Sequence, residues 1–405
     1  MKLCILGKAL GTSDNLMIGD DHFSWAQHVP DDVMILGLNK SSAMSLDYVA
    51  NLFRKPIPTL GGLPHAKFFK SVGLSSSDVH WQKAVGTTAY KKTTEDMIKC
   101  SKSLMVEYEN SDYGTTLSKR LKVLSSLENA FIDKNELTAM IDSEPDTTQT
   151  SNLKTFLPIN RNCEYSQVPI YSGVTTSTGR MKIKSGPQIL TLRKSHRRLI
   201  KSKWGDDGDI ISIDYSSLEP RVALALNGHE PEGDVYEWID NEIFNGSLGR
   251  TRTKILTLSL IYGMSLHSAR NKYGDIKHSD KKQLLSMFSV DKTKRMLKET
   301  DIKELRNYFG RPIFPDKESK LFNSYIQSTA VDIAMLGFDK IISTLRDVGG
   351  CRPLFLIHDE IICDVPSGVL TSAQEIFKGG IEISLRNKSV RFPVTVEKND
   401  DKLCD

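Results

Sequence analysis

The spacing of hydrophobic residues changes along the chain and predicts several different elements. Between residues 93 and 141, apolar residues recur every three or four positions, which is the period of an amphipathic helix. We predict one helix around Leu104 and a second, longer helix over residues 117–131. The polar stretch at residues 142–152 is predicted to end this helical region and separate it from the second half of the chain.

Short apolar runs elsewhere in the chain predict strands. The runs at residues 3–6, 33–38 and 210–214 are each of strand length. Two further runs, at residues 354–357 and 361–365, are separated by only three polar residues. This layout predicts a tight hairpin with acidic residues at its tip.

Two more helices are predicted between these strands, at residues 235–244 and 253–262. A segment rich in Pro and Gly, residues 56–64, is typical of a linker or an extended loop. Helices followed by a mixed sheet with a helical insertion indicate an α+β fold.

The composition of the 405 residues excludes several classes of protein. Hydrophobic residues make up 39% of the chain and charged residues 26%, as in a folded soluble protein. No stretch approaches the roughly 20 apolar residues that span a bilayer, and the start becomes polar too soon for a secretory signal. The six cysteines form no Cys-x-x-Cys pair, which argues against structural zinc or a disulfide framework. We therefore expect a cytoplasmic protein without a membrane partner.

Positive charge is concentrated in one segment, although the net charge is only +4. The segment from Arg180 to Trp204 contains nine cationic residues and no acidic residue. Such a run neutralises nucleic-acid phosphates or forms a solvated basic face. Apolar residues such as Leu192 and Leu199 are interleaved with the cations and predict that the segment folds, but its role stays open at this point.

Asp214 ends the predicted strand at 210–214, immediately before a helix. Ser216 and Glu219 have the spacing of a capping box, in which Glu219 would be a helix cap. Pro220 fits the first helical turn better if Ser217 is the N-cap residue. That arrangement would exclude a capping box between Ser216 and Glu219. Taken alone, Asp214 is as consistent with a turn as with catalysis.

A second acidic site weakens the interpretation of Asp214 as a turn residue. His358, Asp359 and Glu360 lie between two apolar runs, at a position where hairpins usually favour Gly or Asn. Two aspartates on neighbouring strands can hold a pair of divalent metals that clamp the attacking and leaving oxygens of a phosphoryl transfer. Magnesium suits this role because it prefers oxygen ligands and leaves positions open for substrate phosphates.

Four residues at intervals of four, Arg250, Lys254, Leu258 and Tyr262, form one stripe along a predicted helix. Cations at a helix N-terminus oppose the macrodipole, and their presence is easier to understand if they meet an anion such as a triphosphate. The alternative is a basic surface turn before a core helix. That alternative does not explain why the stripe ends in Tyr262-Gly263, an aromatic that could stack on a base.

These three sites resemble, in the same order, the three polymerase motifs of family A DNA polymerases. The similarity extends from about Tyr171 to the C-terminus. The matching segments are Asp-Tyr-Ser-Ser-Leu-Glu-Pro-Arg at 214–221, the stripe from Arg250 to Gly263, His-Asp-Glu at 358–360, Thr-Gly-Arg at 178–180, Gly310-Arg311 with Pro315, and the Asn/Gln segment at 323–333.

The resemblance implies a right-hand polymerase fold, with an antiparallel palm sheet, helical fingers and a helical thumb. The thumb would span residues 91–165, the palm 166–227 and 320–405, and the fingers 228–319, with a region of unknown role at 1–90. It also implies primer–template DNA and dNTPs as partners. We expect a monomer, and accessory replication proteins are further candidate partners.

The resemblance assigns roles to individual residues. Asp214, Asp359 and the Tyr215 carbonyl would hold two Mg²⁺ ions, with Glu360 supporting the metal site. Lys254 would bind the triphosphate and protonate the pyrophosphate leaving group. The other implied nucleotide contacts are Arg250, Leu258, Tyr262 and Glu219, the last excluding ribonucleotides; the implied DNA contacts are Arg180, Arg193, Lys194, Arg197, Arg198, Arg311, Asn323, Gln327 and His358.

The sequence departs from the family pattern in three respects. Leu258 stands where the family usually has Phe or Tyr, and Pro220 replaces an aliphatic residue. Only about 90 residues precede the predicted thumb, and they contain no Asp-x-Glu on a strand. Residues 142–144 have that spacing but lie in the polar stretch. We therefore predict a compact polymerase of phage or viral type without a proofreading exonuclease.

Two alternatives remain from the sequence. A single-subunit RNA polymerase shares the two aspartates and the Lys/Tyr helix, although Glu219 and Glu360 favour the DNA enzyme. A catalytically inactive DNA-binding homologue is the other alternative, and the retained acids argue against it.

Overall fold

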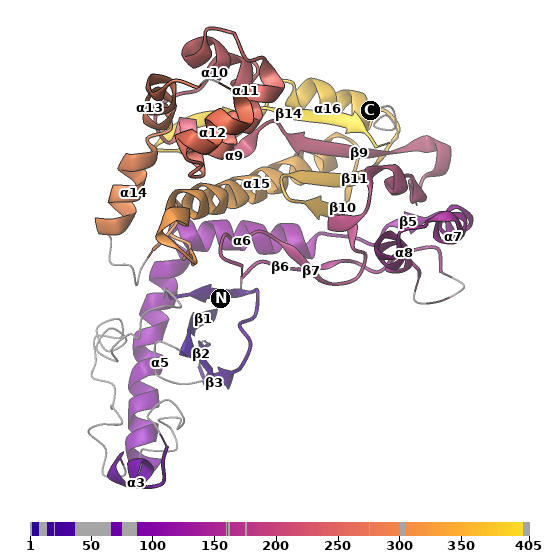
Figure 1. Cartoon of the computed structure of the whole chain (residues 1–405). Helices are drawn as coiled ribbons and strands as arrows, with labels where there is room; N and C mark the ends of the chain where they lie inside the picture. The colour runs from indigo at the N-terminus through magenta and orange to yellow at the C-terminus, as the bar shows by residue number, and fades with distance from the viewer. Residues whose placement is uncertain are drawn as a thin grey trace. The chain divides into compact units, whose positions relative to one another are not determined.

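The computed structural model describes residues 2–7, 14–19, 21–36, 66–74, 87–158, 160, 163–174, 176–274, 276–299 and 305–399 (Figure 1). The linker predicted at residues 56–64 lies outside these ranges. The chain forms two compact units. The first comprises residues 1–118, 174–178 and 292–325, and the second comprises residues 119–173, 179–291 and 326–405.

The first unit contains a four-stranded sheet in the order β3-β2-β1-β4. Strand β1 (Lys2–Ile5) pairs antiparallel with β2 (Asn15–Ile18) and parallel with β4 (Val33–Ile35), and β2 pairs antiparallel with β3 (Phe23–Ala26). Cys4, Met17 and Val33 form a small buried core on this sheet. The strands predicted at 3–6 and 33–38 are confirmed over residues 3–5 and 33–35, and residues 37 and 38 lie outside the described ranges. Strands β2 and β3 were not predicted, because a Gly/Asp-rich stretch obscured their short runs.

The predicted helical region is confirmed, with different internal boundaries. Helix α5 (Thr87–Glu109) has 23 residues, whereas α6 (Asp112–Ser125) has 14, so the prediction that the second helix is the longer one is wrong. Helix α6 does not extend to residue 131, because Phe131 and Ile132 form strand β5 instead. Strand β5 pairs with β8 (Ile200–Lys201). The short helix α3 (Ala66–Ser71) precedes α5 in the chain.

The polar stretch at 142–152 does not end the helical region, contrary to our prediction. Helix α7 (Lys134–Ser143) is followed by α8 (Thr147–Lys154). The Asp146 side chain caps α8 by accepting hydrogen bonds from the backbone N–H groups of Thr148 and Gln149. Leu153 is fully buried, so one apolar residue and a good cap are sufficient to hold this polar helix in place.

The second unit is built on a four-stranded antiparallel sheet in the order β10-β11-β9-β14. Its strands are β9 (Gly208–Tyr215), β10 (Arg352–Ile357), β11 (Glu360–Pro366) and β14 (Val394–Lys398). The predicted strand at 210–214 and the predicted hairpin are therefore confirmed. Nearly all residues of β10 and β11 are buried, as expected of strands covered on both faces.

Helices pack on this sheet. Helix α16 (Val369–Phe377) packs against β14 and β11. The long helix α15 (Leu321–Val348) contributes Phe338, whose ring centre lies 6.1 Å from that of Tyr215. A β-carbon at Gly337 would overlap the Tyr215 hydroxyl, so the glycine makes room for the last residue of β9. The position of Tyr215, next to Asp214, therefore depends on close packing against α15.

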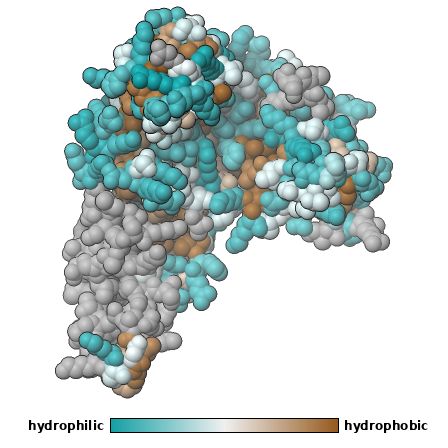
Figure 2. All heavy atoms as spheres, viewed as in Figure 1, coloured by the Kyte–Doolittle hydropathy of each residue, from teal (hydrophilic) through white to brown (hydrophobic). Residues whose placement is uncertain are grey.

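A helical insertion separates β9 from α15. It begins with α9 (Leu218–Ala225) and continues through α10 (Val235–Phe244), α11 (Arg250–Ile261), α12 (Leu266–Tyr273), α13 (His278–Met287) and α14 (Val290–Glu299). The helices predicted at 235–244 and 253–262 are confirmed. Hydrophilic residues form much of the visible surface over α10 to α13 in Figure 2.

The remaining described elements are short. They comprise β6 (Ile170–Ser172) with β7 (Lys182–Ser185), the 3₁₀ turns η2 (Ile189–Thr191), η3 (Lys194–Leu199), η4 (Gly205–Asp207) and η6 (Glu318–Lys320), and the hairpin of β12 (Ile381–Leu385) and β13 (Lys388–Phe392). The α+β class is thus confirmed. Within the described ranges, no helix is long and apolar enough to cross a membrane.

Candidate active site

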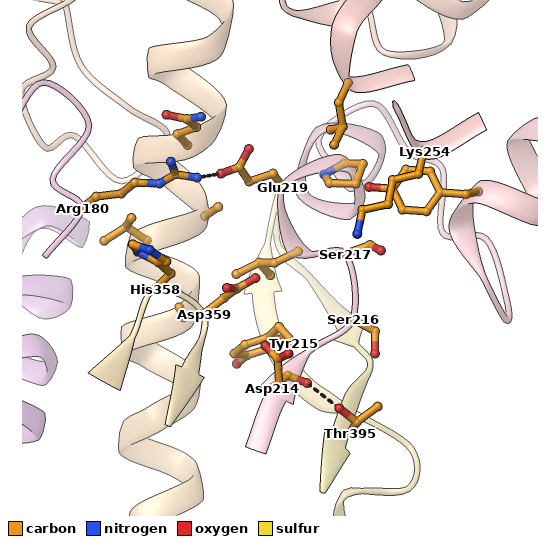
Figure 3. A pocket seen from close by; sticks show the side chains of 18 of the residues that line it. Arg180, Asp214, Tyr215, Ser216, Ser217, Glu219, Lys254, His358, Asp359 and Thr395 are labelled. Atoms are coloured by element: carbon orange, nitrogen blue, oxygen red, sulfur yellow. Dashed lines mark hydrogen bonds and ion pairs between the residues drawn. The ribbon is translucent and has the colours of Figure 1, made fainter. Parts of the chain in front are cut away.

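The second unit contains a cavity of about 640 Å³ at one end of β9 and β11 (Figure 3). Segments far apart in sequence line it, namely the end of β9, the start of α9, helices α11 and α15, and the turn between β10 and β11. It brings together these predicted site residues: Arg180, Asp214, Tyr215, Glu219, Arg250, Lys254, Leu258, Gln327, His358 and Asp359.

Asp214 and Asp359 come from neighbouring strand ends. Strands β9 and β11 pair with Asp214 opposite Glu360, and the Tyr215 N–H donates a 3.2 Å hydrogen bond to the Asp359 carbonyl. Both aspartate side chains line the cavity (Figure 3). Burial, and then the negative charge of Glu219, raise the pKa of the Asp359 carboxyl. A bound cation would relieve this cost, since it favours the ionised carboxylate.

The donor set at these strand ends suits a hard divalent cation. Two carboxylates and a backbone carbonyl are oxygen ligands of the kind that Mg²⁺ prefers. Within the described part of the chain, no group of three or more His, Cys, Asp or Glu side chains is arranged to hold a metal. Asp214 and Asp359 would therefore hold such an ion only together with water or substrate oxygens, which is the usual way in which Mg²⁺ is bound.

The turn that carries His358 and Asp359 is a two-residue hairpin loop, since Ile357 pairs with Glu360. His358 has a φ of 57°, in the left-handed region that such turns require. Gly or Asn adopts this conformation at lower cost than His. The exposed imidazole of His358 lines the cavity, so this turn places a functional side chain where a glycine would be easier to accommodate.

Glu360, which the resemblance implied as a support for the metal site, does not line the cavity. Its buried carboxylate accepts hydrogen bonds from Arg197 Nη1, at 3.1 and 3.3 Å, and from the Ser212 hydroxyl. Arg197 is only 6% exposed, so it is not available for the phosphate contact that we predicted. The structure gives this cation a partner inside the protein instead.

Glu219 is not a helix cap. Helix α9 begins after Ser217, which has a φ of 59° and makes no side-chain capping hydrogen bond, so the box predicted between Ser216 and Glu219 does not form. The Glu219 carboxylate instead accepts a hydrogen bond from Arg180 (Figure 3). It also accepts one from the Tyr262 hydroxyl. Burial, and then the charge of Glu219, raise the pKa of the Tyr262 phenol, so its hydroxyl stays protonated as a donor.

The stripe on α11 faces the cavity through Arg250, Lys254 and Leu258. Arg250 Nε donates a 2.8 Å hydrogen bond to Oδ2 of Asp234. Lys254 forms no ion pair within the described ranges, and its Nζ lies 5.9 Å from the centre of the Tyr236 ring. An exposed ammonium on the wall of a cavity that also holds two carboxylates is suited to bind the phosphates of a metal-bound nucleotide.

The other predicted DNA contacts are dispersed. Arg193 pairs with Glu144 and Asp146, and Arg198 pairs with Glu136, while Lys194 is exposed. These pairings place part of the basic run on a solvated, internally neutralised face. Arg311 and Asn323 belong to the first unit, where Arg311 is buried and donates to the Thr178 carbonyl at 3.2 Å. Neither of these two residues lines the cavity.

Among the residues that line the cavity and that sequence reasoning missed are Asp234, Tyr236 and Thr395. Asp234 caps α10 by accepting from two backbone N–H groups, and an Asp before an apolar helical run was a usable signal for the cap. Thr395 lies opposite Asp214 in the sheet, and its hydroxyl is 3.5 Å from the Asp214 carbonyl. No local pattern could reveal this pairing, because the two residues are 181 positions apart.

The chain is similar in sequence to several curated DNA polymerases. The chain is 24% identical over 249 residues to the thermostable DNA polymerase I of Thermus aquaticus, covering 52% of this chain and 30% of the relative. It is 24% identical over 265 residues to DNA polymerase I of Lactococcus lactis, covering 56% and 30%. The chain thus spans about a third of the length of these curated relatives.

Among solved structures, the chain is similar to the POL domain of Pol1 from M. smegmatis in complex with DNA primer-template and dNTP. The TM-score is 0.46 at 15% identity, covering 87% of this chain and 63% of the other.

The sequence model that describes DNA polymerase family A matches residues 83–401, which include every element that lines the cavity. This match covers most of the chain and confirms the resemblance seen in its motifs. The chain belongs to DNA polymerase family A.

Proposed function

We propose that this protein is a DNA-directed DNA polymerase that adds dNTPs to the 3′ end of a primer. The observation that carries the proposal is the cavity in which Asp214 and Asp359 face the cations of α11. Family membership supports the same activity. Carboxylates on one wall and an arginine and a lysine on another are what a phosphoryl transfer from a triphosphate needs.

The carboxylates of Asp214 and Asp359, with the Tyr215 carbonyl, would hold two Mg²⁺ ions. When bound, these ions activate the primer hydroxyl and neutralise charge on the phosphates. Arg250 and Lys254 bind the triphosphate from the α11 side. Lys254 is also placed to give a proton to the departing pyrophosphate, because its ammonium is exposed to the cavity and free of an acidic partner in the described ranges.

Further residues, inside and outside the cavity, would select the nucleotide and hold the DNA. Glu219 occupies the space beside the sugar 2′ position, and Leu258 presents an apolar surface to the sugar. Tyr262 packs near the nascent base pair. The remaining proposed DNA contacts are Arg180, Gln327, His358, Arg193, Lys194, Arg198, Arg311 and Asn323, of which the first three line the cavity.

We further propose the subdomains of the right-hand fold: a thumb at 91–165, a palm at 166–227 and 320–405, and fingers at 228–319. The antiparallel sheet that carries both aspartates supports the palm, and the helices from α10 to α14 support the fingers. The role of residues 1–90 stays open. Replication of a phage or viral genome, a cytoplasmic location, a monomeric state and accessory proteins stay predictions.

We also propose that the chain has no proofreading site of its own. The described strands β1 to β4 carry no Asp or Glu. Glu144, part of the Asp-x-Glu spacing at 142–144, accepts hydrogen bonds from Arg193 and lies 3.0 Å from Nε2 of His196. These contacts support a structural role for Glu144 rather than a nuclease site.

Primer extension with the purified chain tests the proposed activity. We expect Mg²⁺-dependent extension with dNTPs and little extension with rNTPs on the same primer–template. Preferred use of rNTPs would instead indicate an RNA polymerase. Binding of the primer–template without any extension, under conditions in which a known family member extends it, would indicate an inactive homologue.

A further inference from the structure

A buried ion pair lies next to the candidate active site. Arg197 and Glu360 have side chains that are each 7% exposed, and Nη1 of Arg197 lies 3.1 and 3.3 Å from the two oxygens of Glu360. The Ser212 hydroxyl donates a further hydrogen bond to the same carboxylate. The three residues come from η3, β11 and β9, so the pair joins the basic segment to the two central strands of the sheet.

We propose that Arg197 is a positioning residue for the polymerase site, acting through Glu360. This inference rests on the proposed function. Glu360 lies opposite Asp214 in the sheet and directly follows Asp359 in the chain. Ser212 precedes Asp214 by two residues and therefore lies on the same face of β9. The Glu360 carboxylate on β11 thus contacts Ser212 on β9 close to the strand ends that carry Asp214 and Asp359.

Arg197 differs from the basic residues around it in the sequence because its side chain is buried. Of the nine cations between residues 180 and 203, all of which are described, Arg197 alone is buried. The side-chain amide of Asn399 donates to the Arg197 carbonyl at 3.4 Å and adds a contact to its backbone. Burying a carboxylate is costly unless it is paired and hydrogen-bonded, and Arg197 and Ser212 supply those contacts to Glu360 inside the sheet.

Two roles for Arg197 give different experimental results. A phosphate contact acts on DNA affinity, whereas a positioning residue acts on the turnover of bound DNA. We would compare Arg197→Met, Arg197→Lys, Glu360→Gln and the double variant Arg197→Met/Glu360→Gln with the wild type. Arg391→Met is the matched control, because Arg391 forms an exposed pair with Glu382 at 2.7 Å in the β12–β13 hairpin. The measurements are kcat and KM for dNTP, the Kd of primer–template at several salt concentrations, and the Tm without substrate.

We expect Arg197→Met to lower kcat by roughly 100-fold, as misplaced catalytic groups do, with little change in KM, Kd or the salt slope of Kd. Its Tm falls because Glu360 is left unpaired. Replacing Arg197 with Lys keeps the charge and restores most of the Tm and part of kcat. In the double variant the Tm rises again toward the wild-type value, because no uncompensated carboxylate remains. The control variant changes neither kcat nor Tm appreciably.

Two results would overturn the proposal. One is that Arg197→Met weakens DNA binding and reduces the salt slope by about one while kcat at saturating DNA is unchanged, as for a phosphate contact. The other is that the Tm losses of the two single substitutions simply add in the double variant. If Arg197→Met does not fold, the variants Arg197→Lys and Glu360→Gln are used instead to compare the effect on kcat with the effect on the Kd of primer–template. If the wild type does not extend primers, the proposed function fails, and the Tm cycle still decides whether the two residues are coupled.

Discussion

The carboxylate of Glu219 accepts a hydrogen bond from the hydroxyl of Tyr262, 43 residues away on the far end of α11. Arg180 donates a hydrogen bond to the other oxygen of the same carboxylate. Glu219 is therefore fixed in the cavity by two partners, rather than by a cap on its own helix. This arrangement places its two methylenes and its carboxylate where they can act as a steric barrier.

We expect Glu219→Ala to admit ribonucleotides, because the substitution empties the space proposed to face the sugar 2′ position. The ratio of rNTP to dNTP incorporation should rise roughly 10- to 100-fold, the range that a small steric difference in a pocket provides. Single-nucleotide insertion kinetics measure this ratio. Glu382→Ala, which removes an exposed carboxylate of the β12–β13 hairpin, serves as the control. An unchanged ratio in Glu219→Ala would remove this residue from sugar selection.

Leu258 leads to a second prediction on sugar selection, namely that the enzyme discriminates against nucleotides that lack the 3′ hydroxyl. Leu258 lines the cavity two turns along α11 from Arg250 and offers no hydroxyl to replace a lost hydrogen bond. The wild type should discriminate against dideoxynucleotides, and Leu258→Tyr should relax that discrimination. Competition between ddNTP and dNTP in primer extension gives the ratio. Equal ratios in the wild type and the variant would show that this position does not contact the sugar.

Asp214→Asn should abolish Mg²⁺-dependent nucleotide addition while leaving primer–template binding largely intact. In the proposed function this carboxylate would hold the metal ions that neutralise charge in the transition state, and losing such stabilisation costs at least about 100-fold in rate. DNA affinity depends mainly on phosphate contacts elsewhere. Rapid-quench kinetics and a fluorescence binding assay separate the two effects. Near-normal turnover in this variant would contradict the two-metal assignment.

Asp359 makes a prediction about stability and pH. Burial, followed by the charge of Glu219, raises its pKa, so the Asp359 carboxyl is harder to ionise in the folded protein than in the unfolded chain. Without metal, ionised Asp359 therefore destabilises the fold above this raised pKa. The cost decreases as the pH falls below the raised pKa and is lost only below the ordinary pKa of an aspartate. We expect Asp359→Asn to have a higher Tm than the wild type near pH 7.5 without metal, and the difference to shrink as the pH is lowered. A lower Tm for the variant at neutral pH would contradict this account.

A mismatched primer should persist when it is incubated with enzyme and Mg²⁺ but without dNTPs. The described strands β1 to β4 offer no carboxylate for a nuclease metal site. Gel analysis of a 3′-mismatched primer tests this expectation, with the Asp214→Asn variant as a control for reversal by pyrophosphorolysis. Metal-dependent 3′→5′ shortening that copurifies with the intact chain would overturn it.

Features with a local signal were predictable from the sequence. The stripe on α11 has the helical period, so Arg250, Lys254 and Leu258 were expected on one face, and all three line the cavity. The hairpin around His358 and Asp359 was evident because two apolar runs flank three polar residues. The length of α6 was not predictable, since the apolar residues after it continue the helical spacing but enter a strand whose partner is β8.

Features that depend on distant partners had no such signal. Arg197 and Arg198 are adjacent cations that look equivalent in the sequence. In the folded chain, Arg197 is buried against Glu360, 163 residues away, while Arg198 is exposed and pairs with Glu136. Neighbouring residues of a 3₁₀ turn point in different directions, and only packing decides which direction faces the interior. A charge can be buried only where the fold supplies its counter-ion, and that partner is brought near by the pairing of strands rather than by any spacing along the chain.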